Sequence, residues 1–78
     1  MNMELKMQVL KETIKKIDDL RQFNVPVITK TIEEYEAEGV EEVFINQQKV
    51  LLEKVYTRLG ELEAKKGRIL QELMGIAE

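Results

Sequence analysis

The side chains of this 78-residue sequence that could do chemistry are charged, and a set of basic residues in the C-terminal half stands out. Spaced along a helix, they could line one side of it and bind a nucleotide, a nucleic acid or an acidic protein. The alternative, which we prefer, is charge pairing between neighbouring turns, for example of Glu61 with Lys65. The candidate anion-binding residues are Lys49, Lys54, Arg58, Lys65 and Arg68.

A second charged group is acidic and surrounds Gly39. A site for a cation or a basic partner is one interpretation, and a solvated helix end is the preferred one. The sequence has neither the calcium-loop spacing nor a Glu-x-x-His pair. It also has no histidine and no cysteine, which removes the commonest general base and the commonest metal ligands. We therefore expect no enzymatic activity, no metal and no cofactor. The acidic residues are Glu33, Glu34, Glu36, Glu38, Glu41 and Glu42.

The composition favours a folded helical protein, with 44% hydrophobic and 35% charged residues and one proline. The net charge of −3 argues against unassisted binding to nucleic acid. No apolar run approaches the roughly 20 residues that span a bilayer, and the N-terminus lacks the pattern of a secretory signal. We expect one domain in the cytoplasm. A chain this short, without disulfides, is expected to gain stability by forming oligomers.

The clearest structural signal lies in residues 40–76, where alternating spacings of three and four predict one long helix. Two members of this row, Gln48 and Lys66, are polar. They either fix the register or the choice of partner, or the lysine stem packs while its ammonium group reaches water. The row, called the core stripe below, consists of Ile45, Gln48, Leu52, Val55, Leu59, Leu62, Lys66, Ile69, Leu73 and Ile76.

The N-terminal half predicts helices at about 3–22 and 26–38. Pro26 separates them, either as a kink or tight jog in one continuing helix or as a true reversal of the chain. Arg21 and Asn24 are polar where the apolar row should continue, which marks the same place as irregular. The predicted core residues of this half are Met3, Met7, Leu10, Ile14 and Ile17, followed by Ile28, Ile32 and Tyr35.

Gly39 is the strongest helix-stop signal and joins two arms of similar length, so the sequence predicts an all-α antiparallel helical hairpin of the coiled-coil type. Apolar residues beside the core stripe, such as Leu51 and Leu70, make the stripe too wide for one partner helix. We therefore expect a helical bundle formed by a homo-oligomer, most simply a dimer. The predicted protein-interface residues are Ile45, Leu52, Val55, Leu59, Leu62, Ile69, Leu73, Leu51 and Leu70.

The stretches Gly39–Leu52 and Leu59–Leu70 resemble a helix of the flagellar export chaperones of the FlgN type. The similarity covers less than half of the chain and consists mostly of Leu, Glu and Lys at heptad spacing, and no residue role is carried over from it. The function predicted from the residues is a non-enzymatic protein-binding module, namely an assembly adaptor, a chaperone or a small inhibitor. The alternative is a binder of a small ligand or nucleotide in a basic pocket between helices of an oligomer.

Overall fold

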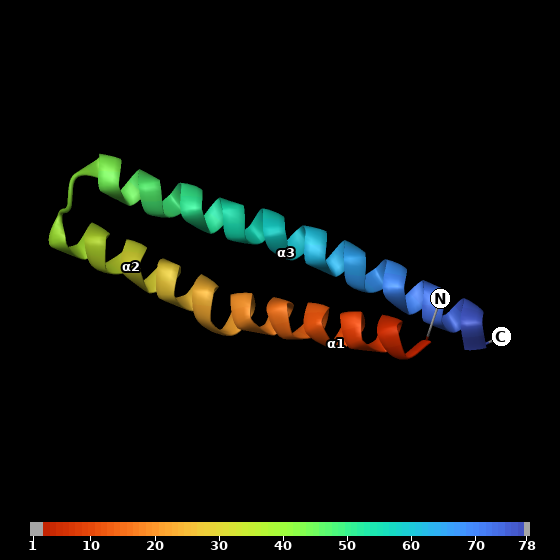
Figure 1. Ribbon diagram of the computed structural model, residues 1–78. Coiled ribbons are helices and arrows are strands. Elements are labelled where there is room, and N and C mark those ends of the chain that lie inside the picture. The colour runs from red at the N-terminus through yellow and green to blue at the C-terminus, as the bar shows by residue number, and fades with distance from the viewer. Residues whose placement is uncertain (1–2, 78) are drawn as a thin grey trace.

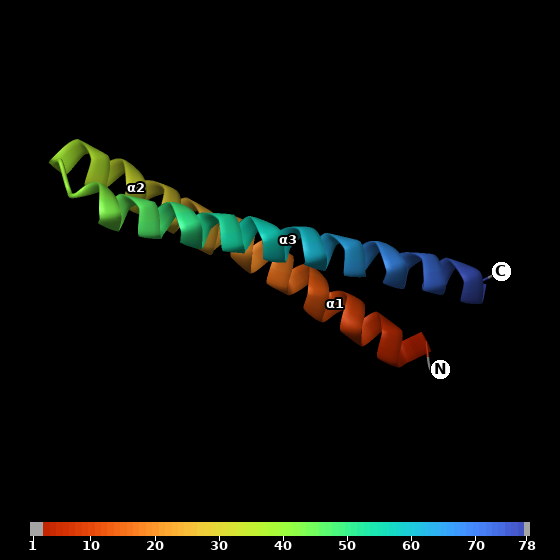
Figure 2. The same ribbon diagram turned by 90° about the horizontal axis from the view of Figure 1, so that it is seen from above.

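The computed structural model describes residues 3–77 and shows two antiparallel helical arms joined by a short bend. The first arm consists of α1 (Met3–Asp19), a π-helical turn η1 (Leu20–Asn24) and α2 (Val25–Glu38), and the second is α3 (Glu42–Ala77). The start of α1 and the end of α3 lie at the same end of the hairpin, opposite the bend (Figure 1), and the arms cross when seen from above (Figure 2). The predicted all-α hairpin is thus confirmed. No helix within residues 3–77 meets the length and hydropathy needed to cross a membrane.

The bend begins at Gly39, whose φ of 72° and ψ of 30° place it in the left-handed region that glycine adopts without a steric cost. The amide of Val40 donates to the carbonyl of Tyr35 over 3.0 Å, which satisfies one of the last free carbonyls of α2. Glycine therefore ends this helix as predicted. Because Val40 and Glu41 are used to turn the chain, α3 begins at Glu42, two residues later than expected.

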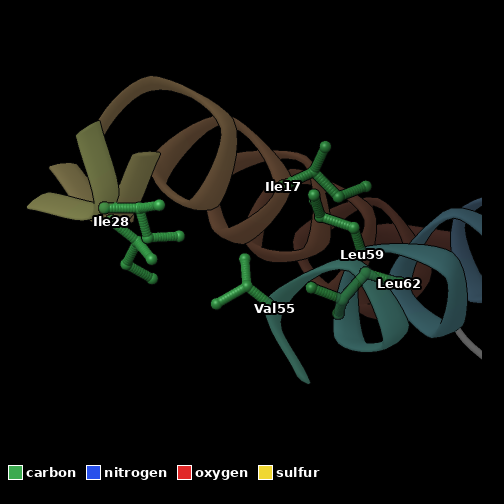
Figure 3. Packing of buried hydrophobic residues seen from close by; sticks show 6 residues of the cluster. Ile17, Ile28, Val55, Leu59 and Leu62 are labelled. Atoms are coloured by element: carbon green, nitrogen blue, oxygen red, sulfur yellow. The ribbon is translucent and has the colours of Figure 1, made fainter. Parts of the chain in front are cut away.

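The core is a single row of aliphatic side chains between the arms. Figure 3 shows the side chains of Ile17 and Leu59 turned toward each other, with Leu62 beside them. Leu62 is 2% exposed, and Ile69 extends the buried row of α3 toward the open end. The side chain of Ile76 is outside the part that the structure describes. The central cluster consists of Ile17, Ile28, Ile32, Val55, Leu59 and Leu62.

The core positions of α1 agree with the prediction at Leu10 and Ile17, but Thr13 takes the place expected for Ile14. Thr13 is 2% exposed, and its hydroxyl donates to the carbonyl of Val9 over 2.7 Å, which satisfies the buried polar group. The stripe of α1 therefore runs through Leu10, Thr13 and Ile17, with half-buried Lys6 before them. The prediction was wrong for Met7 and Ile14, which lie exposed beside this stripe, and for Met3, which is exposed at the start of α1.

The π-helical turn explains the irregularity near Pro26. The amide of Val25 donates to the carbonyl of Leu20, five residues back, so this turn holds one residue more than an α-helical turn. The extra residue lets Leu20 and Val25 pack against the core, while Arg21 and Asn24 stay exposed. The looser turn also contains the carbonyl with which the Pro26 ring would clash in an α-helix. The chain therefore continues through Pro26 without reversing.

Candidate protein-binding surfaces

The structure divides the nine predicted interface residues into two groups. Seven belong to the core stripe and face the first arm of the same hairpin. Four of these are buried, namely Val55, Leu59, Leu62 and Ile69, and three are half-buried, namely Ile45, Leu52 and Leu73. They hold the two arms together. Leu51 and Leu70 are 44% and 40% exposed and are open to a partner.

The two exposed leucines lie on opposite flanks of the core stripe. Leu51 comes one residue before a stripe position and Leu70 one residue after, so the 3.6-residue period sends them to different sides of α3. Nη2 of Arg21 lies 2.7 Å from Oε1 of Glu63. Because Glu63 is seven residues before Leu70, this ion pair lies on the same flank of the hairpin as Leu70. The hairpin thus carries two separate apolar surfaces.

The first surface lies on the Leu70 flank toward the open end. Ile14 precedes Arg21 by seven residues, and Leu70 follows Glu63 by seven. Since the arms are antiparallel and Arg21 pairs with Glu63, Ile14 and Leu70 lie side by side one heptad beyond the ion pair. All members of this surface are exposed by at least 38%. It is called the open-end face and consists of Met7, Ile14, Leu70 and Met74.

Two helical glycines, Gly60 and Gly67, continue this flank in α3, at successive spacings of seven that end at Met74. A Cβ atom placed on either glycine would meet no atom within 4 Å, so the packing of the hairpin does not require glycine there. Each glycine costs about 1 kcal/mol of helix stability relative to alanine. They leave a low surface beside Leu70 where another backbone could approach closely.

The second surface lies on the Leu51 flank near the bend. It is a shallow groove of about 280 Å³ between the two arms, called the closed-end groove. Phe23 and Val27, both 62% exposed, and Leu51 form its rim. Ile28 and Val55, which belong to the core, form its floor. Asn24 completes the lining, so the π-helical turn supplies one wall.

The basic residues are only partly brought together. Lys54, Arg58, Lys65 and Arg68 follow one another at spacings of four, seven and three and share a side of α3. Lys49 precedes Glu63 by two heptads and therefore lies on the opposite flank, the one that carries Glu63 and Leu70. The five candidates therefore do not form one anion-binding set.

Carboxylates offset part of the positive charge on the basic side of α3. Nη1 of Arg58 donates to Oε2 of Glu61 over 3.2 Å, so Glu61 pairs with Arg58 and not with Lys65 as the sequence suggested. The hollow beside Lys54 and Arg58 is also lined by Glu53 and Glu61, and α3 alone forms it. Within this hollow two carboxylates face two cations, and a hollow of balanced charge with a single wall disfavours an anion or nucleotide site.

Lys66 interrupts the core stripe without leaving a buried charge. Its ammonium nitrogen lies 3.9 Å from Oε2 of Glu63, and both side chains are about one-third exposed. The stem therefore packs at the edge of the core while the charge reaches the surface. Gln48, the other polar stripe residue, is half-buried.

Two further charged features belong to the ends of the hairpin. At the open end, Lys6 of α1 pairs with Glu72 of α3. The hydrogen bond and the positive charge of Lys6 lower the pKa of Glu72 below its ordinary value. At the bend, all six acidic residues are exposed, and no group of three potential ligands is positioned for a metal ion within the described residues.

Sequence reasoning missed Thr13 in the core and Val27 on the groove, whereas Phe23 was expected to be a core or interface residue and lies on the groove. The signal for both missed residues was available, because polar Arg21 and Asn24 at stripe positions indicated an extra residue in the turn.

Comparisons of the chain with protein-family models, with curated proteins and with solved structures found no match.

Proposed function

We propose that this protein is a non-enzymatic adaptor that binds a helix of another protein on its open-end face. The observation that carries the proposal is that face itself, a cluster of exposed aliphatic side chains contributed by both arms. Scattered exposed apolar residues are ordinary on a protein surface, whereas a contiguous cluster is typical of an interaction site. A chaperone or a small inhibitor would use the same surface in the same way.

The geometry favours a helix as the bound element. Met7 and Ile14 form one exposed row on α1, and Leu70 and Met74 form a second row on α3 beside it. The side chains of a third helix fit between two such rows. Gly60 and Gly67 allow that helix to approach α3 closely, which accounts for two glycines that the hairpin does not need. The partner's helix then covers the part of the apolar stripe that the two arms of the hairpin leave exposed.

A site-specific cross-link tests this proposal. A photo-reactive residue at Leu70 is expected to capture one defined protein in the native cell, which is then purified and titrated against the hairpin. Ile14→Lys, on the other arm of the same face, should weaken that binding at least tenfold. Val50→Lys is the matched control, because Val50 is 50% exposed but lies on the outward side of α3.

Loss of binding in Ile14→Lys with retention in Val50→Lys supports the open-end face as the binding site. Equal affinities for all three forms would contradict it. Circular dichroism of each variant separates lost binding from lost folding, since all of them should remain helical.

A further inference from the structure

The closed-end groove remains unused by this adaptor function, and its chemistry is distinctive. Phe23 stands beside the hollow that Val27 and Leu51 border, so one surface presents both a protruding ring and an apolar recess. A surface with both parts can be complementary to itself, as a two-fold symmetric contact between identical chains requires.

The charges of the hairpin are divided in a way that favours one orientation of such a contact. Residues 31–48, which include the bend, hold six of the 15 acidic residues and none of the 12 basic ones. The remainder of the chain therefore carries a net positive charge. Arg58 and Lys65 lie one and two heptads beyond Leu51 on the groove flank, so positive charge adjoins the groove on the side away from the bend.

The exposed area of the hairpin is also larger than its mass requires. A compact monomer of 9.1 kDa exposes about 4,900 Å², whereas this chain exposes 5895 Å². The difference of about 1,000 Å² exceeds the roughly 800 Å² that each partner buries in a standard interface. The cause is the rod shape of 58 × 15 × 14 Å, which side-by-side packing of two rods would make more compact.

From these three observations we infer that the partner at the closed-end groove is a second copy of this chain. Two hairpins lie antiparallel, with a two-fold axis at the groove, and the Phe23 ring of each copy enters the recess beside Leu51 of the other. The acidic bend of each copy then lies along the basic middle of its partner. The inference extends the proposed adaptor function to a bivalent one, in which the dimer leaves both open-end faces free.

Sedimentation equilibrium tests the dimer. Wild-type protein at tens of micromolar should sediment as a dimer, and Leu51→Glu should sediment as a monomer because the two introduced carboxylates meet near the axis. Tyr56→Glu is the matched control: Tyr56 is 54% exposed and lies on the other flank of α3, so this variant should remain dimeric. A monomeric wild type, or a dimer that Leu51→Glu leaves unchanged, would overturn the inference.

Cross-linking tests the relative orientation of the two hairpins in the dimer and requires only a mild substitution in the groove. The chain has no cysteine, so a single introduced cysteine reports on one position. With a short thiol-reactive cross-linker, Asn24→Cys in the groove should form covalent dimers and Glu38→Cys at the bend should not. Covalent dimers at both positions would indicate a parallel dimer and would overturn the antiparallel arrangement, and no covalent dimer of Asn24→Cys would overturn the groove contact itself.

The experiments test the dimer and the adaptor function independently. If the protein is a monomer that still captures a partner at Leu70, the dimer is excluded and the adaptor function is supported. If it is a dimer that captures no partner at Leu70, the dimer is supported and the adaptor function is excluded.

Discussion

The two arms of the hairpin bury apolar stripes of similar length, but the residue spacing within the stripe differs between them. The second arm, α3, keeps spacings of three and four from Ile45 to Leu73 without interruption. The first arm keeps them only in two halves, since Leu20 and Val25 are five residues apart. The π-helical turn absorbs the extra residue and returns both halves to the same side.

This difference shows that the phase of a helical stripe is set by the whole arm and not by each local pattern. Met3, Met7, Leu10, Ile14 and Ile17 fit a local heptad in α1, but that register would continue into Arg21 and Asn24. A small rotation of α1 keeps Leu10 and Ile17 in the stripe and buries Thr13 in place of Ile14, which costs little because the threonine hydroxyl is satisfied by the helix itself. In exchange, Leu20 and Val25 both join the core.

The largest expected effect comes from deleting one residue in each arm. Deletion of Gln22 together with Pro26→Ala should preserve the hairpin, because Leu20 and Val25 then stand four apart and the stripe continues as an ordinary α-helix. Deletion of Thr57 in α3 should unfold it. That deletion rotates the rest of α3 by about 100° and moves Glu63 toward the core where Leu62 packs.

Thermal unfolding followed by circular dichroism compares the two deletions. The Gln22 variant should melt no lower than the wild type, whereas the Thr57 variant should show no cooperative transition. If both deletions were equally harmful, the π-helical turn would have a role beyond correcting the register.

A smaller effect distinguishes the two possible registers of α1. Thr13→Lys should lower the free energy of unfolding by roughly 2–3 kcal/mol, because it forces a charge into a position that is 2% exposed. Ile14→Lys should cost no more than about 1 kcal/mol, since that side chain is 38% exposed. Urea denaturation of both variants measures the order, and the register predicted from the local heptad requires the reverse order.

Most of the fold followed from the sequence because its signals were long or chemically unambiguous. The core stripe of α3 repeats over ten positions, and Gly39 has few other roles between two helices, so both were predicted. The exposed groove as a whole was not predicted, because Val27 lies beside Phe23 on one rim only through the extra residue at η1. A predicted stripe also identifies the apolar positions without telling whether the same chain or another one covers them, which is why seven of the nine predicted interface residues lie inside the hairpin.

Replacing glycine with alanine should lower the free energy of unfolding in the bend and raise it in α3. Gly39→Ala is expected to destabilise by about 1 kcal/mol, because Gly39 has a φ of 72° that a Cβ disfavours. Gly67→Ala is expected to stabilise by up to about 1 kcal/mol, since it is helical and a Cβ there meets nothing within 4 Å. Urea denaturation of both variants provides the comparison, and stabilisation by Gly39→Ala would contradict the left-handed turn.

The smallest expected effect is the pH dependence of the ion pair that ties the two arms together at the open end. Because Lys6 lowers the pKa of Glu72 in the folded state, the folded state favours the ionised carboxylate more than the unfolded state does. The pair therefore stabilises the hairpin above the ordinary glutamate pKa of 4.5, and this contribution is lost as the pH falls through the lowered value. Glu72→Gln removes the titration, so wild type and variant should differ most near neutral pH and converge in acid. The exposed position of Glu72 and screening by salt keep the difference small, so urea midpoints should be compared at low ionic strength. A difference that grows as the pH falls would show that the pair does not stabilise the arms.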